Sequence, residues 1–375
     1  MIAKTFFGLE EVLMQELLQL GAKNVEKQNR AVSFEGDKEL LYRSNLQLRT
    51  ALRILIPFKS EIVKNEKQLY NCIRKVDWSQ YFSEKNSIYI DSVVTSEAFN
   101  HSKYVAQVTK DAIVDQFRKA SGKRPRVERQ RPDFVINVHI YQETITIAMD
   151  SSGESLHMRG YRQDTNDAPL NEVLAAGLVL NSQWKADKTF IDLTCGSATI
   201  LIEAARFAFN IHPMKSRTYF GFKNWKDFDF KLYQEIISDI ESKEVAKDVA
   251  LIGMEISAQT AQIAKRNIRS AGLEGKIEIR PKAFQKMVAP EGKAIIISNP
   301  PYDERLQEAD INNLYYDLGE KLFTDFKGSE AWFISSNLGA LKSISLKTKK
   351  RVKLMNGPLE AFFYGYDIRE EDEVS

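Results

Sequence analysis

The chain has 375 residues, of which 43% are hydrophobic and 28% charged. This composition is typical of a folded globular protein, and the length predicts two or three domains of ordinary size. It excludes a wholly disordered chain and a small disulfide-stabilised peptide. Two cysteines and four scattered histidines predict neither a disulfide framework nor a zinc site, so we expect no metal.

No stretch of the sequence is long and apolar enough for a membrane helix. The first 18 residues carry acids within their apolar pattern, unlike a signal peptide. We therefore expect a cytoplasmic protein without a membrane partner.

Charge is balanced over the whole chain but not along it. Lys and Arg total 53 against 51 acids, whereas residues 101–132 hold nine bases and three acids, a local net charge of +6. Such a segment attracts phosphate groups, and a merely solvated face is the alternative. A second basic run covers residues 342–353. Seven bases of the first run are the candidate RNA-binding residues: Lys103, Lys110, Arg118, Lys119, Arg124, Arg126 and Arg129.

The apolar pattern divides the chain into three parts. A first α+β unit ends near residue 60, and its expected elements are a helix over 8–20, a strand over 31–34, a helix over 38–52 and a strand over 53–58. A second α+β unit ends near residue 160, and its expected elements are helices over 66–76 and 104–119 and strands over 87–94, 134–140 and 144–149. Part of the first basic run lies on helix 104–119.

The remaining residues, from 161 to 375, alternate between helices and short apolar strands. A helix over 171–180 and the apolar strand 189–193 begin this pattern, which continues to Tyr366. Such alternation predicts a mostly parallel sheet with helices on both faces. The expected domains are therefore 1–60, 61–160 and 161–375.

The apolar strand 189–193 leads into a small-residue turn. The sequence Asp192-Leu-Thr-Cys-Gly-Ser-Ala-Thr199 permits close approach of the backbone to a ligand. A dinucleotide fingerprint needs two further glycines where Ala198 and Leu201 stand, which disfavours NAD. The next strand ends at Glu255, whose carboxylate can accept hydrogen bonds from both hydroxyls of a ribose. An ordinary surface acid is the alternative. A nucleoside site without a phosphate cradle favours S-adenosylmethionine.

A polar tetrad, Asn299-Pro-Pro-Tyr302, follows four apolar residues at the end of another strand. Open α/β sheets bind their ligands at such strand ends. An exocyclic amine of a base is a poor nucleophile, and the Asn299 side chain and the Pro300 carbonyl can accept its two hydrogens and orient its lone pair. Tyr302 can stack on the base. The predicted catalytic residues are Asn299, Pro300, Pro301 and Tyr302, and a plain turn is the alternative.

These motifs resemble class I methyltransferases that modify exocyclic amines of adenine or guanine. Further stretches narrow the resemblance to the THUMP-containing 23S rRNA guanine-N2 methyltransferases, whose members are also labelled N6-adenine-specific DNA methylases. Those stretches are His101-Ser-Lys-Tyr104, Lys110-Asp-Ala-Ile-Val-Asp115, Ser155-Leu-His-Met-Arg-Gly-Tyr-Arg162, Ala168-Pro-Leu170 and Asn356-Gly-Pro-Leu-Glu360. The resemblance covers almost the whole chain. It implies a ferredoxin-like unit at 1–60, a THUMP RNA-binding domain at 61–160 and a Rossmann-like α/β methyltransferase domain at 161–375.

The resemblance also implies S-adenosylmethionine as the cofactor and large-subunit rRNA as the partner. Its implied cofactor-binding residues are Asp192, Thr194, Cys195, Gly196, Ala198, Thr199, Glu255, Ile256, Phe284 and Asn299. Ala198 stands where the family usually has glycine, and its methyl group is expected where the cofactor approaches closely. No acid follows the fourth strand to receive the adenine amine, and we expect Phe284 to pack on the ring instead. Cys195 is assigned to packing. His157, Arg159 and Arg162 are assigned to interdomain hydrogen bonds, and contact with RNA or with the methionine end of the cofactor is the alternative.

Three functions are compatible with these residues. The first is methylation of guanine N2 in large-subunit rRNA. The second is methylation of adenine N6 in DNA, because the tetrad serves both amines, and the third is a non-catalytic RNA-binding assembly factor. The basic α+β units favour structured RNA over DNA. Some relatives carry a second, fused methyltransferase domain after this region, and since the chain ends at Ser375 we expect a single activity.

Overall fold

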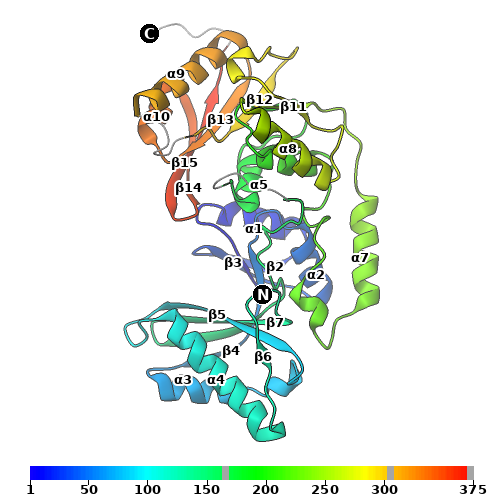
Figure 1. The fold of residues 1–375 in the computed structure, drawn as a ribbon, viewed down its shortest axis with the longest axis vertical. Helices are drawn as coiled ribbons and strands as arrows, with labels where there is room; N and C mark the ends of the chain where they lie inside the picture. The colour runs from blue at the N-terminus through cyan, green and yellow to red at the C-terminus, as the bar shows by residue number, and fades with distance from the viewer. Residues whose placement is uncertain (163–168, 302–307, 370–375) are drawn as a thin grey trace.

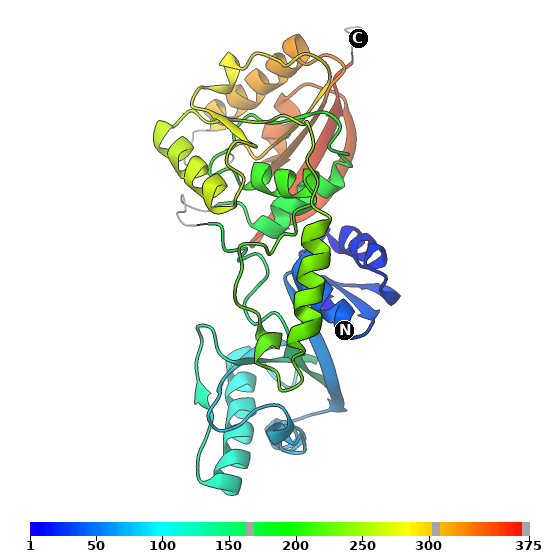
Figure 2. The same cartoon turned by 90° about the vertical axis from the view of Figure 1, so that its right-hand side faces the viewer.

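The computed structural model describes residues 1–162, 169–301 and 308–369. The molecule is elongated, and its three parts lie one above another (Figures 1 and 2). The second unit (61–160) and the carboxyl-terminal domain (161–369) lie at opposite ends, with the amino-terminal unit (1–60) between them. Among the described helices, none combines the length and hydrophobicity needed to span a membrane.

One continuous sheet joins the first two units. Their elements are β1 (Ile2–Lys4), α1 (Glu10–Gln19), β2 (Lys23–Gln28), β3 (Ala31–Glu35), α2 (Lys38–Gln47), β4 (Arg53–Ile62), α3 (Glu66–Arg74), β5 (Ser87–Thr95), α4 (Ser102–Ser121), β6 (Arg126–Val127), β7 (Phe134–Tyr141) and β8 (Thr144–Asp150), with a 3-10 turn at Trp78–Gln80. In the described residues the strand order is β2-β3-β1-β4-β8-β7-β5-β6.

Strand β4 is the joint between the two units. Its first residues, 53–55, pair with β1, and residues 55–62 pair with β8. The domain boundary that we expected near residue 60 therefore lies inside a strand. The short β1 and the polar edge strand β2 carry no period-2 apolar pattern, which is why the sequence did not predict them.

The second unit has its own core, in which α4 covers the sheet. The buried face of α4 includes Val105, Ala112, Ile113 and Phe117, and it packs with Ile88, Ile136 and other residues of β5 and β7. The helix ends at Gly122, whose φ of 70° lies in the left-handed region that terminates helices. The opposite face of α4 carries four of the predicted basic residues, Lys103, Lys110, Arg118 and Lys119.

The carboxyl-terminal domain is a sheet covered by helices on both faces. Its elements are α5 (Glu172–Asn181), β9 (Thr189–Asp192), α6 (Thr199–Ala208), α7 (Phe230–Ser242), β10 (Leu251–Met254), α8 (Ala258–Ser270), β11 (Glu278–Arg280), β12 (Ala294–Ser298), α9 (Glu308–Asp325), β13 (Glu330–Ser335), α10 (Leu338–Ser343), β14 (Thr348–Asn356) and β15 (Leu359–Asp367), with 3-10 turns at Gly221–Asn224 and Phe284–Lys286.

Strand order in this sheet creates a crevice at β9. The order over the described residues is β11-β10-β9-β12-β13-β15-β14, so the chain moves outward from β9 in both directions. Phe190 of β9 lies in the core beneath α5, α6 and α8, while the next residue, Ile191, lies in the core beneath α9 and α10. Because order reverses at β9, the loops after β9, β10 and β12 diverge and leave a space between them.

The last two strands depart from the predicted parallel alternation. Strand β15 is antiparallel to β13 and forms a hairpin with β14. The second basic run lies largely on β14, where Lys349 pairs with Glu330 and Asp367, and Lys353 pairs with Glu360. Acidic residues thus neutralise part of the positive charge of this run.

The amino-terminal unit packs directly on the carboxyl-terminal domain. Helix α7 lies along α2 (Figure 2). Tyr42 of α2 stacks on Phe222 of the carboxyl-terminal domain. On the other side, the loop after β1 reaches β14. A Cβ atom added to Gly8 would lie 2.2 Å from the backbone oxygen of Lys353, so only glycine fits this contact.

We expect Gly8→Ala to destabilise the protein more than Gly21→Ala. Both glycines have similar positive φ values, 89° and 86°, which cost an alanine about 1–2 kcal/mol. Only Gly8 faces a neighbouring backbone, since nothing lies within 4 Å of a Cβ at Gly21. In Gly8→Ala the steric contact should lower the free energy of unfolding by a further 1–3 kcal/mol, roughly the cost of overpacking a core. Urea unfolding of the two variants measures the difference, and equal losses would show that the Gly8 contact is not tight.

Candidate active site

A cleft of about 770 Å³ opens at the carboxyl ends of β9, β10 and β12. A smaller cavity of about 160 Å³ adjoins it and shares Thr194, Gly196 and Asn299. The predicted residues that line the cleft are Thr194, Gly196, Glu255, Ile256, Phe284, Asn299, Pro300 and Pro301. Those that line the smaller cavity also include Asp192, Cys195 and Thr199. Residues from three separate strand ends therefore meet in one place.

The turn after β9 and the residue after β10 are bonded to each other. Glu255 accepts the backbone N–H of Gly196 at 3.1 Å through one carboxylate oxygen and that of Ser257 at 2.8 Å through the other. An ionised carboxylate has about four acceptor sites, so each oxygen keeps capacity for a further donor. Both oxygens are thus positioned by the backbone and available to a ligand with two hydroxyl groups.

Ala198 lies beneath the turn and not in the cavities. It is fully buried among core residues, with φ at 68°, and it is not one of the described residues that line either cavity. The left-handed conformation, rather than contact with a ligand, is the feature that favours glycine at this position. The methyl group that we expected beside the cofactor therefore faces the core.

Asn299 presents an unsatisfied acceptor to the cleft. The residue follows β12 directly, and its side-chain oxygen is buried without a hydrogen-bond partner among the described residues. A buried acceptor left in this state costs free energy that a ligand donor can recover. Thr194 has a buried, unpartnered hydroxyl in the same cleft. Tyr302, the fourth residue of the tetrad, lies outside the described residues.

Apolar side chains form flat walls near Glu255. Ile256 is 77% exposed although it is a large hydrophobic residue, and Phe284, from the 3-10 turn after β11, is buried. Both line the cleft. An exposed isoleucine and a phenylalanine beside a bidentate carboxylate suit a planar heterocycle attached to a ribose.

The sequence did not predict two contributors to the cleft. Phe6 comes from the loop after β1 in the amino-terminal unit, and residues 356–359 come from the turn between β14 and β15. The stretch Asn356-Gly-Pro-Leu was noted for its resemblance but was given no role. Phe6 carries no local signal, because only the packing of the amino-terminal unit on β14 brings it to the cleft.

The predicted RNA-binding residues lie away from the cleft. Lys103, Lys110, Arg118 and Lys119 are on α4, at the end of the molecule opposite β10 and β12 (Figure 1). Arg124, Arg126 and Arg129 are exposed in and beside β6. The structure thus gathers these residues on the second unit and separates them from the proposed chemistry.

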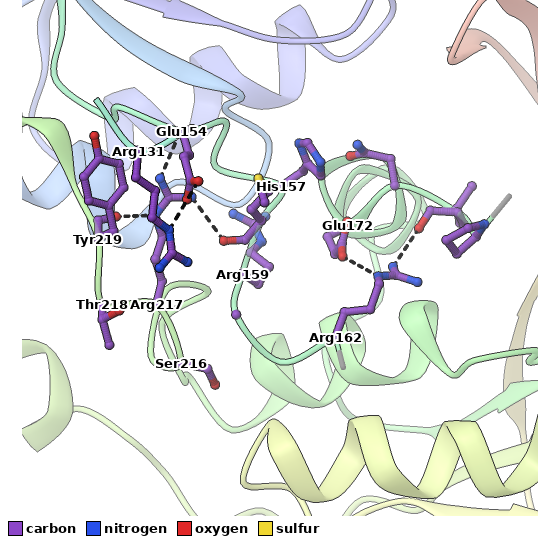
Figure 3. Close-up of a pocket in the computed structure, with 15 residues that line it drawn as sticks. Arg131, Glu154, His157, Arg159, Arg162, Glu172, Ser216, Arg217, Thr218 and Tyr219 are labelled. Carbon is purple, nitrogen blue, oxygen red and sulfur yellow. Dashed lines mark hydrogen bonds and ion pairs between the residues drawn. The ribbon is translucent and has the colours of Figure 1, made fainter. Parts of the chain in front are cut away.

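A third space, the junction cavity, lies where the second unit, the linker 151–162 and the carboxyl-terminal domain meet (Figure 3). Its volume is about 620 Å³, and it shares Pro169 and Asn171 with the cleft. Arg162 lines it and also bonds Glu172 at 2.8 Å and Thr199 at 3.1 Å, next to the small cavity. Arg159 is buried and donates to the carbonyl of Leu156.

Comparison with known proteins places this fold and site in a family. The profile of an RMKL-like methyltransferase domain matches residues 159–363, that of the RlmL ferredoxin-like domain residues 1–55, and that of the THUMP domain residues 63–150. The chain belongs to the RMKL-like methyltransferase family. The predicted fold class is confirmed, and S-adenosylmethionine is confirmed as the cofactor of this family.

Relatives cover nearly all of the chain. A Synechocystis protein named as an RNA methyltransferase is 36% identical over 96% of this chain and 94% of its own length. The ribosomal RNA large subunit methyltransferase K/L of Shewanella sp. strain MR-4 is 37% identical over 97% of this chain, but this chain spans only 52% of that protein. Among solved structures, SMU.472, named as a methyltransferase and crystallised with SAH, has a TM-score of 0.88 at 28% identity, covering 99% and 98% of the two chains.

Asp192 makes the folded protein sensitive to pH. Burial raises its pKa to about 7 from an ordinary 3.8, and the nearby Glu255 adds to the rise. The folded state therefore binds more protons than the unfolded state between about pH 4 and pH 7. The resulting contribution to stability is present at low pH and is lost as the pH rises through about 7.

We expect Asp192→Asn to remove this dependence. The amide keeps an acceptor for the backbone N–H of Thr194, which lies 3.1 Å from the carboxylate oxygen. Relative to the wild type, the free energy of unfolding of the variant should increase between about pH 5 and about pH 8. Chemical unfolding at both pH values measures it, with the exposed Asp187, just before β9, substituted by asparagine as the control. If the free energies of unfolding of the variant and the wild type differed by the same amount at both pH values, the raised pKa of Asp192 would be contradicted.

Proposed function

We propose that this chain transfers a methyl group from S-adenosylmethionine to the exocyclic N2 amine of a guanine in large-subunit rRNA. The observation that carries the proposal is the buried, unpartnered side-chain oxygen of Asn299 in a cleft whose other walls suit a nucleoside cofactor. Membership of the family supports the reaction type. The names of the Shewanella and Synechocystis relatives, together with the THUMP match, support an RNA substrate.

The residues present fit the cofactor. Glu255 has an acceptor oxygen for each ribose hydroxyl, and Ile256 and Phe284 offer apolar surfaces to an adenine ring. The unpartnered Thr194 hydroxyl and the buried Asp192 carboxyl lie where the turn meets the small cavity and can receive the amino-acid end. When bound, S-adenosylmethionine supplies a methyl group activated by its sulfonium charge.

The protein's part in the reaction is to position the amine. The Asn299 oxygen and the Pro300 carbonyl accept hydrogen bonds from its two N–H groups. These bonds favour a geometry in which the nitrogen lone pair leaves conjugation with the ring and points toward the methyl donor. Pro301 lines the same wall of the cleft. The two hydrogen bonds strengthen as the nitrogen becomes tetrahedral, so they stabilise the transition state more than the bound substrate.

A protein nucleophile is not required. Cys195, the nearest thiol, is buried, and burial raises its pKa well above the ordinary value, so it stays protonated. Its role is to pack beneath the turn. This agrees with direct transfer of the methyl group in a single displacement.

We also propose that the second unit binds the RNA through its basic face. Lys103, Lys119, Arg124, Arg126 and Arg129 are exposed on or beside α4 and β6. Backbone contacts of this kind give affinity without reading sequence. The adenine-N6 reaction on DNA stays as the alternative substrate, because the acceptors at Asn299 and Pro300 suit either amine.

We expect Glu255→Ala to weaken S-adenosylmethionine binding by about tenfold or more. Hydrogen bonds to a charged group contribute about 1.5–3 kcal/mol, and the variant loses both acceptor oxygens. Glu255→Gln keeps one acceptor oxygen, so its affinity for S-adenosylmethionine should lie between those of Glu255→Ala and the wild type. Isothermal calorimetry measures the affinity, with Glu274→Ala on the protein surface as the control and thermal unfolding to verify the fold. Unchanged affinity in Glu255→Ala would contradict the cofactor site.

We expect Asn299→Ala to slow methyl transfer by about a hundredfold or more, since loss of one oriented polar group from an active site costs about 2.7–4 kcal/mol in the transition state. Affinities for RNA and cofactor should change little. Single-turnover rates on large-subunit rRNA and on DNA, with products identified by mass, measure the effect and the substrate together. Methylated adenine in DNA with none in rRNA would refute the proposed substrate even if Asn299 proved essential.

A further inference from the structure

The junction cavity has a position that the proposed function leaves unexplained. It lies between the basic second unit and the cleft, and it shares Pro169 and Asn171 with the cleft. An RNA held on the second unit with one base in the cleft would run past it. Tyr219 donates to the carbonyl of Pro132, and Asn224 to that of Asp133, so the walls from the two units are bonded together.

The lining of the junction cavity is cationic. Four arginines, Arg131, Arg159, Arg162 and Arg217, line it with two glutamates, Glu154 and Glu172. All five N–H groups of Arg217 are donated to backbone carbonyl oxygens, which hold the side chain rigidly but carry no net charge. The charge of Arg217 is compensated only through space, by Glu154 and Asp150. The four arginines and two glutamates of the lining leave a net positive charge that attracts an anion.

Several donors in this cavity have capacity left for a ligand. The side chain of Arg131 is 68% exposed and lies 3.5 Å from Glu154, a loose ion pair (Figure 3). The hydroxyl oxygen of Ser216 accepts from the buried Arg206 at 2.9 Å, which leaves its O–H to donate. Together with the hydroxyl of Thr218, these groups suit a phosphate oxygen.

His157 supplies an acceptor among these donors. The Ser155 hydroxyl lies 3.3 Å from the carbonyl oxygen of Leu52 and 2.8 Å from Nδ1 of His157. In the tautomer in which Ser155 donates to Leu52, Nδ1 of His157 carries the proton and donates to Ser155. The other ring nitrogen then carries a lone pair. Burial first, and then Arg159, Arg217 and Arg162, lower the pKa of His157 to about 4, which keeps the ring neutral at physiological pH. A neutral acceptor beside a phosphate site matches the 2′-hydroxyl that distinguishes RNA from DNA.

We propose that the junction cavity binds a ribose–phosphate segment of the substrate RNA beside the nucleotide in the cleft. Arg131 contacts the phosphate, and His157 accepts the 2′-hydroxyl. This assignment rests on the proposed function, since it takes the RNA substrate from there. It adds a site that holds the strand close to the chemistry, in addition to the distant basic face on α4.

The first test compares Arg131→Gln with Arg269→Gln. Arg269 is a matched control, because its side chain is 71% exposed and pairs with Glu274, but it lies on α8 away from the junction cavity. Equilibrium binding of an rRNA fragment is measured over a series of salt concentrations. Arg131→Gln should lower affinity and reduce the log–log salt slope by about 0.7–0.9, the loss of one phosphate contact. Arg269→Gln should change neither quantity, and S-adenosylmethionine affinity should be equal in both.

The second test changes the RNA instead of the protein. Single 2′-deoxy substitutions are placed at each nucleotide flanking the methylated one, and binding to the wild type is measured. One position should lose affinity, and that loss should disappear in His157→Leu. The wild-type scan stands by itself if the variant does not fold. No sensitive position would overturn the assignment of His157.

The outcomes separate the two proposals. If the wild type methylates rRNA but Arg131→Gln has an unchanged salt slope, the junction cavity proposal is wrong and the proposed function stands. If the slope falls but no guanine is methylated, the proposed reaction is wrong while the RNA site stands. Competition by inorganic phosphate with an unchanged RNA slope would show an anion site unrelated to RNA and would overturn the proposal.

Discussion

The reversal of strand order at β9 is the constraint on which the site depends. Because β10 lies on one side of β9 and β12 on the other, the loops that follow these strands must separate, and the space between them becomes the cleft. Asp192, Glu255 and Asn299 each stand at or just after a strand end. Residues far apart in the chain therefore converge without any local feature that brings them together.

The meeting of these strand ends buries polar groups that are costly to remove from water. Burial raises the pKa of Asp192 to about 7, and the oxygen of Asn299 and the hydroxyl of Thr194 are buried without partners among the described residues. Ala198 holds a left-handed conformation under the turn. Natural sequences tolerate such local conflicts mainly where function requires them, and the surrounding cores, above and below the sheet, hold the groups in place.

Coupling between the three parts comes from buried arginines as well as from apolar cores. Arg217 of the carboxyl-terminal domain donates to four backbone carbonyls of the linker, and Arg49 of the amino-terminal unit donates to the carbonyls of Arg206 and Ile211. Strand β4 joins the two amino-terminal units through one sheet. The basic face on α4 is thereby held in a defined relation to the cleft, which is what an RNA bound at both places requires.

The sequence alone determined most local features of this protein. Helical periodicity predicted α1, α3 and α4, and apolar runs ending in Asp192, Glu255 and Asn299 indicated the strand ends of a methyltransferase, because burial and strand period leave a direct record in residue order. It did not record contacts between distant segments. Only the tertiary structure decided that β4 joins two units, that Phe6 and the turn at 356–359 reach the cleft, that Ala198 faces the core, and that four arginines surround a cavity. These features depend on packing between elements separated by up to hundreds of residues, and no periodicity within a segment encodes such packing.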